Sequence, residues 1–216
     1  MRRREFDNRI TEEALAMIEQ NETLRNAKST VLFNENWHKG VIGIVASRLT
    51  DSYYRPTIVL TRSNNLITGS ARSIKNFDIY DAIDNCSDLL EHFGGHKYAA
   101  GLSLKPENLE EFSRRFEEYV ANNIDKEELV PEINVDLEID FSDITPKFVR
   151  VLKQFAPFGP GNMAPVFLSR NVVDTGLSRS VGNKKHLKLT IAQKQDTSLV
   201  FAGIAFQKGE DYMRVH

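Results

Sequence analysis

The chain has 216 residues, enough for one or two domains with a real hydrophobic core, and its formal net charge of −2 is close to neutral. This near-neutral total neither supports nor excludes nucleic acid as a partner, so an anion site must be a local cluster of cations. The single cysteine, Cys86, excludes a disulfide framework and any metal site built from several cysteines, and it fits a reducing, cytoplasmic compartment. No stretch is long and apolar enough to span a membrane, so we expect no membrane partner.

The N-terminal segment predicts a helix that connects this chain to an earlier domain. Residues from Thr11 to about Ala27 carry a weak apolar face, with Thr11 as the expected N-cap and acidic residues in the first turn. The arginines at the start are followed by acidic residues instead of an apolar run, which excludes a signal peptide. We therefore expect residues 1–28 to be a connector helix cut from a longer chain.

The pattern over residues 29–124 predicts an α/β domain with a mixed sheet. Buried strands are expected at 29–33 and 57–60, with a helix over 41–49 between them. This order favours a right-handed crossover and a parallel pair of strands. A third strand is expected over 66–71, after a short polar turn.

The second half of this domain begins with a strongly amphipathic run. Apolar residues from Ile79 to Phe93 follow the i, i+3, i+4, i+7 spacing, so we predict one helix that Asp78 caps and that Gly94 ends as a left-handed residue. A strand over 99–104 and a helix with apolar residues from Leu109 to Val120 follow. Together these elements complete the expected α/β domain.

Residues 125–216 predict a mostly β, OB-like barrel domain that begins with a charged linker. One helix is expected over 148–155. The expected strands lie at 135–141, 166–174, 186–192 and 199–206. These are too few to close a barrel, so we expect the domain to be incomplete and truncated at the C-terminus.

Two stretches of the α/β domain pair cations with small residues at the ends of elements. His38 and Lys39 precede the expected helix at 41–49, where free amides and the helix dipole favour an anion. In the stretch from Gly69 to Ser73, Arg72 can bind a phosphate with two hydrogen bonds, and Ser70 and Ser73 can donate hydrogen bonds. The alternatives are a solvated loop anchored by Trp37 and a strand that ends with Arg72 on the surface.

A third stretch combines Gly94, Gly95 and His96, just before the strand at 99–104. Two adjacent glycines permit a turn whose amides form an anion-binding nest, and His96 then projects beside it. The alternative is a plain helix stop followed by a surface histidine. An isolated Gly-Gly-His stretch favours that alternative, but two glycines, a histidine and the small residues Ala99, Ala100 and Gly101 in one row favour a ligand.

The second domain has a basic stretch that contains Lys184 and Lys185 around a Gly-Asn turn. It can follow a phosphate backbone, or it can be the solvated tip of a hairpin. The many acids between Glu127 and Asp143 have no metal-cluster spacing, so we predict no metal site in this chain.

Three first-domain segments, WHKGVIGIVASRL, TGSARS and FGGHKYAAGLSL, occur in this order and resemble the DHHA1 module of the RecJ single-stranded-DNA exonucleases. The segment FAPFGPGNMAPVF, followed by HLKLTI, resembles the OB-type domain that comes next in that family. The resemblance covers nearly all of the chain. The catalytic domain of that family, which holds manganese or magnesium through clusters that include a DHH triplet, is expected to be missing, because the triplet does not occur here.

The resemblance implies the nucleic-acid-binding C-terminal portion of a 5′-to-3′ exonuclease that acts on single-stranded DNA in repair and recombination. This portion would bind no cofactor, supply no catalytic residue and be inactive alone, and its partners would be single-stranded DNA and its own N-terminal DHH domain. Arg72 is the first expected phosphate ligand, followed by His96 with the amides of Gly94 and Gly95, and then His38.

Two other functions remain open. One is a DHHA1 phosphoesterase of short oligonucleotides or cyclic dinucleotides, although such enzymes need no OB-like domain. The other is a non-catalytic interaction module in which the glycines serve only turns.

Overall fold

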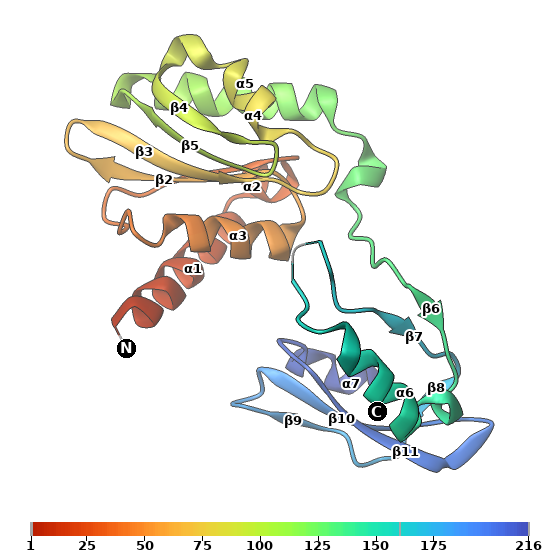
Figure 1. The fold of residues 1–216 in the computed structure, drawn as a ribbon. Coiled ribbons are helices and arrows are strands. Elements are labelled where there is room, and N and C mark those ends of the chain that lie inside the picture. The colour runs from red at the N-terminus through yellow and green to blue at the C-terminus, as the bar shows by residue number, and fades with distance from the viewer. Residues whose placement is uncertain (1, 160, 216) are drawn as a thin grey trace. The chain divides into compact units, whose positions relative to one another are not determined.

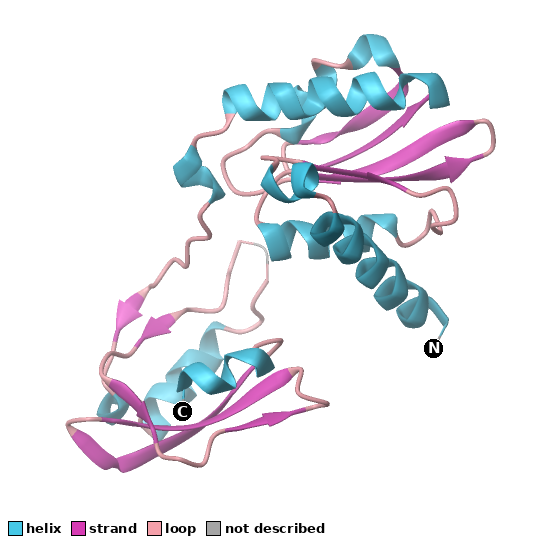
Figure 2. Cartoon of the chain, turned by 180° about the vertical axis from the view of Figure 1, so that it is seen from behind, coloured by secondary structure: helices cyan, strands magenta, loops and turns pink. Residues whose placement is uncertain are grey.

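The computed structural model describes residues 2–159 and 161–215, and it divides into two compact units, Met1–Glu132 and Ile133–His216 (Figure 1). The first unit is a sheet with helices on both faces, and the second is rich in strands (Figure 2). The expected fold class, an α/β domain with a mixed sheet followed by a mostly β domain, is confirmed.

The first unit is built on a five-stranded sheet in the order β1-β2-β3-β5-β4. Its strands are β1 Thr30–Phe33, β2 Thr57–Ser63, β3 Leu66–Arg72, β4 Leu90–His96 and β5 Ala99–Leu104. The β1–β2 pair is parallel, as expected, and the crossover between these strands contains α3 Ile42–Tyr53. The other neighbours are antiparallel, so β4 is an edge strand.

Helices cover both faces of this sheet (Figure 1). On one face lie α4 Ile79–Asp84 and α5 Leu109–Asn123, and on the other lie α1 Arg2–Gln20, α2 Glu22–Asn26 and α3. Side chains of β2 point alternately to the two faces of the sheet and so contribute to two separate cores. Ile58 and Leu60 pack towards α5, while Val59 packs towards α3. Along β3, Ile67, Gly69 and Ala71 therefore face α4 and α5, and Thr68, Ser70 and Arg72 face the side of α3.

The predicted start of the first helix at Thr11 is wrong. Thr11 lies within α1, and its hydroxyl donates a hydrogen bond to the Asp7 carbonyl oxygen one turn earlier (2.8 Å). The first residues of α1 are polar, so the sequence shows no apolar periodicity there that would predict a helix. Further along α1, Ile10, Ala14 and Ile18 form a buried apolar stripe that packs against α3. The packing against α3 therefore extends the helix in the N-terminal direction.

The single helix predicted from Ile79 to Phe93 is also wrong. The helix α4 ends at Asp84, a 3-10 turn follows at Ser87–Leu89, and Leu90–His96 is strand β4. Leu90 and Phe93 fit either a helix or a strand, and in the structure the free edge of β5 pairs with this segment. Gly94 is therefore an extended strand residue, and the expected turn with an amide nest does not form.

The second unit contains a long antiparallel hairpin with shorter strands paired to it. Its strands are β6 Leu137–Glu138, β7 Phe167–Leu168, β8 Val172–Asp174, β9 Arg179–Val181, β10 His186–Gln193 and β11 Asp196–Ala205, and its helices are α6 Pro146–Leu152 and α7 Tyr212–Val215. Strands β8, β9 and β11 all pair with β10, and β6 pairs with β7 in parallel. Across residues 133–159 and 161–215, these strands do not close into a barrel.

Two strands predicted for this unit are shorter than expected. Of the strand predicted over 135–141 from its apolar alternation, only the two residues of β6 form a strand, and its last predicted residue, Phe141, begins a 3-10 turn that extends to Asp143. The strand predicted over 166–174 is interrupted, because Asn171 has a positive φ of 54° that no strand accommodates. The hairpin strands β10 and β11 lie where the sequence predicts them.

Candidate nucleic-acid interface

Three strands of the first unit align their small and polar residues in rows on one face of the sheet. The β3, β5 and β4 residues Arg72, Ala99 and His96 form one row. Ser70, Gly101 and Gly94 form the next row, and Thr68, Ser103 and His92 form the third. Because alternate residues of a strand share a face, all nine lie on the side of α3, and we call this surface the polar face.

The polar face carries unusually little side-chain volume at its centre. Gly94 and Gly101 are both exposed, and neither has a positive φ. A methyl group at Gly94 would meet no atom of the described structure within 4 Å, and one at Gly101 would meet only the Gly69 carbonyl oxygen at 3.8 Å. The fold therefore has room for side chains at both positions, and glycine there leaves the backbone open to a close ligand.

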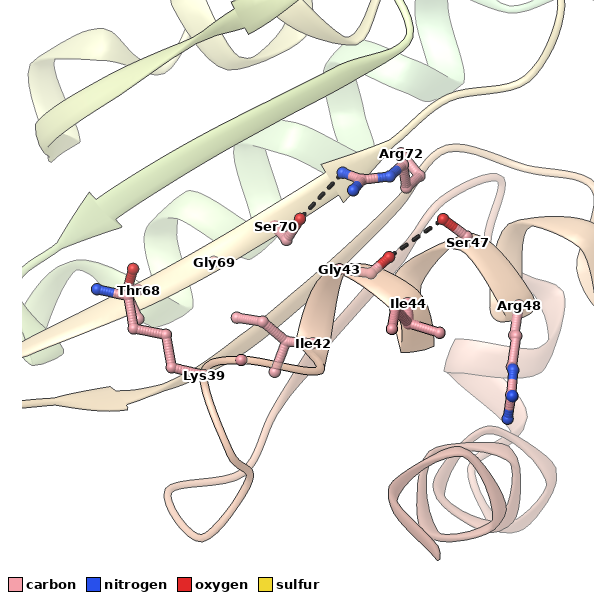
Figure 3. A pocket seen from close by; sticks show the side chains of 11 residues that line it. Lys39, Ile42, Gly43, Ile44, Ser47, Arg48, Thr68, Gly69, Ser70 and Arg72 are labelled. Carbon is pink, nitrogen blue, oxygen red and sulfur yellow. Dashed lines mark hydrogen bonds between the residues drawn. The ribbon is translucent and has the colours of Figure 1, made fainter. Parts of the chain in front are cut away.

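The start of α3 forms one wall beside the polar face. A cavity of about 480 Å³ lies between the first turns of α3 and β3, and Figure 3 shows its lining. Among the described side chains none caps the helix start, so the first-turn amides of Ile42 and Gly43 leave the positive end of the helix dipole directed at this cavity. Lys39 extends from the preceding loop towards Thr68 (Figure 3).

Arg72 and Ser70 lie together on the far wall of this cavity. The Arg72 Nη1 donates hydrogen bonds to the Ser70 hydroxyl (3.0 Å) and to the Ala71 carbonyl oxygen (2.7 Å), which hold the guanidinium along the strand (Figure 3). Gly43 permits this approach, because a methyl group there would lie 3.1 Å from Arg72 Nη2 and 3.1 Å from the Ser70 hydroxyl. Helix amides, a lysine and an arginine thus line one cavity, a combination suited to phosphate.

A second cavity of about 500 Å³ continues from the first along the sheet. It shares Lys39, Thr68 and Gly69 with the first cavity and extends to Ser103 on β5 and His92 on the edge strand β4. The two cavities therefore form a single groove from the start of α3 across β3 and β5 to the edge strand, which we call the sheet groove.

Most of the residues predicted from the first domain lie in or beside the sheet groove. Ser70, Arg72 and Lys39 line it, Gly94 lies on the polar face, and His96 ends the row of Arg72. Two strand spacings separate Arg72 from His96, about 10 Å between backbones. Contacts of all these residues with a ligand stay a prediction.

Three predicted residues have other surroundings. His38 Nδ1 accepts a hydrogen bond from the Gly40 amide (3.0 Å), and its ring lies 6.3 Å from that of Phe6 of α1. The Ser73 hydroxyl donates to the Phe77 carbonyl oxygen (2.8 Å). Gly95 has a φ of 154°, and a methyl group there would overlap the backbone of the facing strand, 2.5 Å from the Ala100 Cα, so the β4–β5 hairpin itself requires this glycine.

Lys184 and Lys185 lie in the second unit, in the turn between β9 and β10. Gly182, Asn183 and Lys184 all have positive φ, between 55° and 63°, so the Gly-Asn turn predicted from the sequence is present. Both lysines are exposed, and the turn is held by a hydrogen bond from the Gly209 amide to the Lys185 carbonyl oxygen (3.3 Å).

Five residues of the polar face are not among the ligand-binding residues predicted from the sequence, namely Thr68, His92, Ala99, Gly101 and Ser103. His92 was missed because the predicted helix over 79–93 hid its strand. A signal was present, since His92, Gly94 and His96 recur at every second position, the period of a strand.

Within the described residues, no group of three or more histidine, cysteine, aspartate or glutamate side chains is placed to hold a metal ion. None of the described helices has the length and apolarity needed to cross a bilayer.

Comparison with known protein families identifies both units. Residues 26–122 match the DHHA1 domain, and residues 135–216 match the RecJ OB domain. The fold and the groove thus belong to a DHHA1 domain joined to an OB domain of the RecJ type. The chain belongs to the RecJ family, in which it corresponds to these two domains.

Curated relatives are several times longer than this chain. The single-stranded-DNA-specific exonuclease RecJ of Bacillus subtilis is 36% identical over 96% of this chain, which spans 26% of that protein. The protein of the same name from Haemophilus influenzae is 35% identical over 81% of this chain and 31% of its own length.

Solved structures of RecJ from Thermus thermophilus share the fold. The structure in complex with Mn²⁺ has a TM-score of 0.73 at 28% identity and covers 94% of this chain and 31% of that one. The structure in complex with Mg²⁺ has a TM-score of 0.69 at 28% identity and covers 87% of this chain and 28% of that one.

Proposed function

We propose that this chain is the nucleic-acid-binding portion of a single-stranded-DNA-specific 5′-to-3′ exonuclease that acts in the cytoplasm in DNA repair and recombination. Its sheet groove holds the sugar-phosphate backbone of a single strand for a metal-dependent DHH domain that lies outside this sequence. The metal, Mn²⁺ or Mg²⁺, and the hydrolytic water belong to that domain, so this chain alone binds DNA without cleaving it.

The observation that carries the proposal is the convergence of anion-binding groups on one groove that is open at its centre. Arg72, Lys39 and the free amides of α3 line one end of the groove. The exposed glycines Gly94 and Gly101 leave the sheet accessible further along. A sugar-phosphate chain is bound through repeated contacts with backbone amides and cations, and it needs a surface without bulky side chains. The sheet groove offers the amides and cations at one end and the open surface further along.

The order of two domains also supports the proposal. An OB domain is a common module for single strands, and the curated relatives are named as exonucleases specific for single-stranded DNA. In the second unit, Lys184 and Lys185 are exposed cations suited to the phosphates of the same ligand.

The binding of a labelled single-stranded oligonucleotide, followed by fluorescence anisotropy over a range of salt concentrations, tests the proposal. We expect weak binding that salt reduces, because phosphate contacts release counterions. Arg72→Ala should weaken binding by about ten- to a hundredfold, the usual loss for a charge-assisted hydrogen bond, and should reduce the salt dependence.

The matched control is Arg62→Ala. Arg62 belongs to the same sheet, but it shares the face of Ile58 and Leu60 and pairs with Glu35 (3.8 Å). Its loss should leave the affinity unchanged. Equal losses for Arg72→Ala and Arg62→Ala, or no binding at low salt, would reject the sheet groove as the binding site.

A further inference from the structure

One cavity of the first unit has no part in the proposed function. It has a volume of about 440 Å³, and the described residues that line it are Phe6, His38, Gly40 and Val41. Val41 is buried and belongs to the cluster of buried residues that joins α1 to α3, whereas Phe6 is 41% exposed. We call this space the apolar cavity. A concave surface with exposed rings and an apolar floor favours a ligand with an apolar face.

The loop that carries His38 is fixed by hydrogen bonds at several points. Trp37 is buried, its indole donates to Glu13 of α1 (2.9 Å), and its carbonyl oxygen accepts from the Thr61 hydroxyl (2.6 Å). The Gly40 amide donates to His38 Nδ1 (3.0 Å), which fixes the direction of the ring. The wall of the apolar cavity is thus pre-organised, which lowers the entropy that a ligand would have to offset on binding.

The side chains of the apolar cavity match the chemistry of a nucleobase. The ring centroids of Phe6 and His38 lie 6.3 Å apart, with 36° between the ring planes. Because His38 Nδ1 accepts a hydrogen bond, the hydrogen of the neutral ring lies on Nε2, which is then a donor. Arg9 lies over the Phe6 ring, with its guanidinium carbon 5.2 Å from the ring centroid. A nucleobase has apolar faces that stack on such rings and carbonyl groups at its edge that accept hydrogen bonds.

Two carboxylates of α1 adjoin the lining residues, and both form ion pairs. Asp7 is only 5% exposed and pairs with Arg48 of α3 (2.6 Å). Glu13 pairs with Arg9 (3.5 Å). Among the described residues, Lys39 forms no ion pair within 4.0 Å. The negative charge of these two acids is therefore offset, and the charge of Lys39 is available to a phosphate.

The apolar cavity adjoins the sheet groove at Gly40, which lines both. The groove is lined there by Lys39 and the first turn of α3, which suit a phosphate, and the apolar cavity by Phe6 and His38, which suit a base. A methyl group at Gly40 would lie 3.0 Å from Cε1 and 3.1 Å from Nδ1 of His38, so glycine lets the ring lie close to the backbone. The two halves of one nucleotide, its phosphate and its base, thus have adjoining sites.

We propose that the apolar cavity is a nucleobase site, in which the base of one nucleotide packs against Phe6 and His38 while its phosphate lies at the start of α3 in the sheet groove. This inference rests on the proposed function, because it assigns the base of a ligand whose backbone lies in that groove. It adds a contact with a base, whereas the groove contacts the sugar-phosphate chain. A single nucleotide is then a sufficient ligand.

NMR titration of the isotope-labelled full chain tests this site with two small ligands, thymidine 5′-monophosphate and 2-deoxyribose 5-phosphate, which lacks the base. The nucleotide should bind about five- to a hundredfold more tightly than the sugar phosphate, the usual range for stacking of a base on an aromatic residue. Phe6→Ala should bind both ligands with the affinity that the unaltered chain has for the sugar phosphate. Its melting temperature should stay close to that of the unaltered chain, because Phe6 belongs to neither cluster of buried residues. Val130→Ala alters an exposed apolar residue (59%) of the same unit outside the three cavities, and this matched control should keep the full preference for the nucleotide.

Equal affinities of the unaltered chain for the two ligands, or no binding of either, would overturn the base site. A preference for the nucleotide that survives Phe6→Ala would place the base elsewhere, and an equal loss for both ligands in that variant would mean that Phe6 acts through the fold, so each of these results overturns it too. The labelled single strand separates the two proposals. If Arg72→Ala weakens binding of the strand although the small ligands show no preference, only the base site fails. If the chain binds no strand at low salt, the proposed function fails, whatever the small ligands do.

Discussion

Gly94 of β4 lies directly opposite Gly101 of β5, on the exposed polar face of the first unit. Neither position needs glycine for its backbone conformation or for packing, because a methyl group would meet open space or a single atom at 3.8 Å. A strand interior without side chains costs stability, and the proposal that a ligand lies against the sheet gives a reason for both glycines.

Replacement of both glycines should therefore separate binding from stability. The double variant Gly94→Ala/Gly101→Ala is expected to melt at or slightly above the temperature of the unaltered chain, since alanine reduces the entropy of the unfolded state. Its affinity for a single strand should fall by about tenfold, roughly 1.4 kcal/mol, because two methyl groups occupy the groove. Gly203→Ala, at an open strand position of the second unit, is the control for binding. An unchanged affinity in the double variant would show that no ligand approaches these residues.

The neighbouring Gly95 should behave in the opposite way. Its φ of 154° and the overlap of a methyl group with the Ala99 carbonyl oxygen leave no room for a side chain. Gly95→Ala should lower the free energy of unfolding by about 2–3 kcal/mol, through backbone strain and steric overlap. Circular dichroism during thermal unfolding measures this loss. A melting temperature equal to that of Gly94→Ala would contradict the different roles of the two adjacent glycines.

Arg55 should be the main polar anchor of the N-terminal helices. It is only 5% exposed, and its guanidinium donates to the carbonyl oxygens of Leu24 (2.7 Å), Arg25 (3.2 Å) and Ala27 at the end of α2. Burial lowers the pKa of this guanidinium from its usual value. Arg55→Ala leaves these carbonyl groups without their charged donor and should cost about 2–4 kcal/mol.

Urea unfolding followed by the fluorescence of Trp37 measures this cost, because Trp37 is the single tryptophan and is buried in the same unit. Arg62→Ala, at an exposed position, should change the free energy of unfolding by no more than about 0.5 kcal/mol. Equal stabilities of the two arginine variants would show that α2 does not depend on this anchor.

Cys86 should be inert in the folded chain. It is fully buried, and burial raises the pKa of its thiol, so the reactive thiolate is both shielded and scarce at neutral pH. A thiol reagent that reports by absorbance should react slowly with the native chain at pH 8 and quickly after denaturation in guanidinium. Complete reaction of the native chain within seconds would mean that the core around α4 opens readily.

Divalent metal should not turn this chain into a nuclease. Under the proposed function the metal and its water belong to a DHH domain outside this sequence, so addition of Mn²⁺ to a pure sample should leave a labelled single strand intact in a gel assay. The same chain should still bind that strand under these conditions, although it does not cleave it. Cleavage that Mn²⁺ supports and a chelator abolishes would contradict this division of roles.

The sheet of the first unit was predictable because its strands carry unambiguous signals. Buried runs such as Thr57 to Leu60, and alternation such as Ala99 to Leu104, fit only one kind of element. The segment from Leu90 to His96 was ambiguous, because Leu90 and Phe93 fit both periods and only the pairing with β5 decides between them. The choice depends on a partner strand that no local pattern reveals.

The candidate site was predictable where a motif lies on a correctly assigned element. Ser70 and Arg72 follow from the end of β3, and the structure brings them to the α3 start as two walls of one cavity. His38 could not be placed from the sequence, because the direction of its ring depends on the Gly40 amide and on Phe6 of α1. The position of Gly101 directly opposite Gly94 emerges only from the register of β4 and β5.

Whether single-stranded DNA lies along the sheet groove of the DHHA1 unit is tested most directly by heteronuclear NMR. The isotope-labelled 24.6 kDa chain is titrated with a single strand that carries deoxyribose without bases at every position, because this ligand offers only a sugar-phosphate backbone. We predict that signals of Thr68 to Arg72, His92 to His96 and Gly101 to Ser103 shift together and saturate at one ligand concentration. Shifts confined to other parts of the chain, with these three strands unchanged, would contradict the central claim.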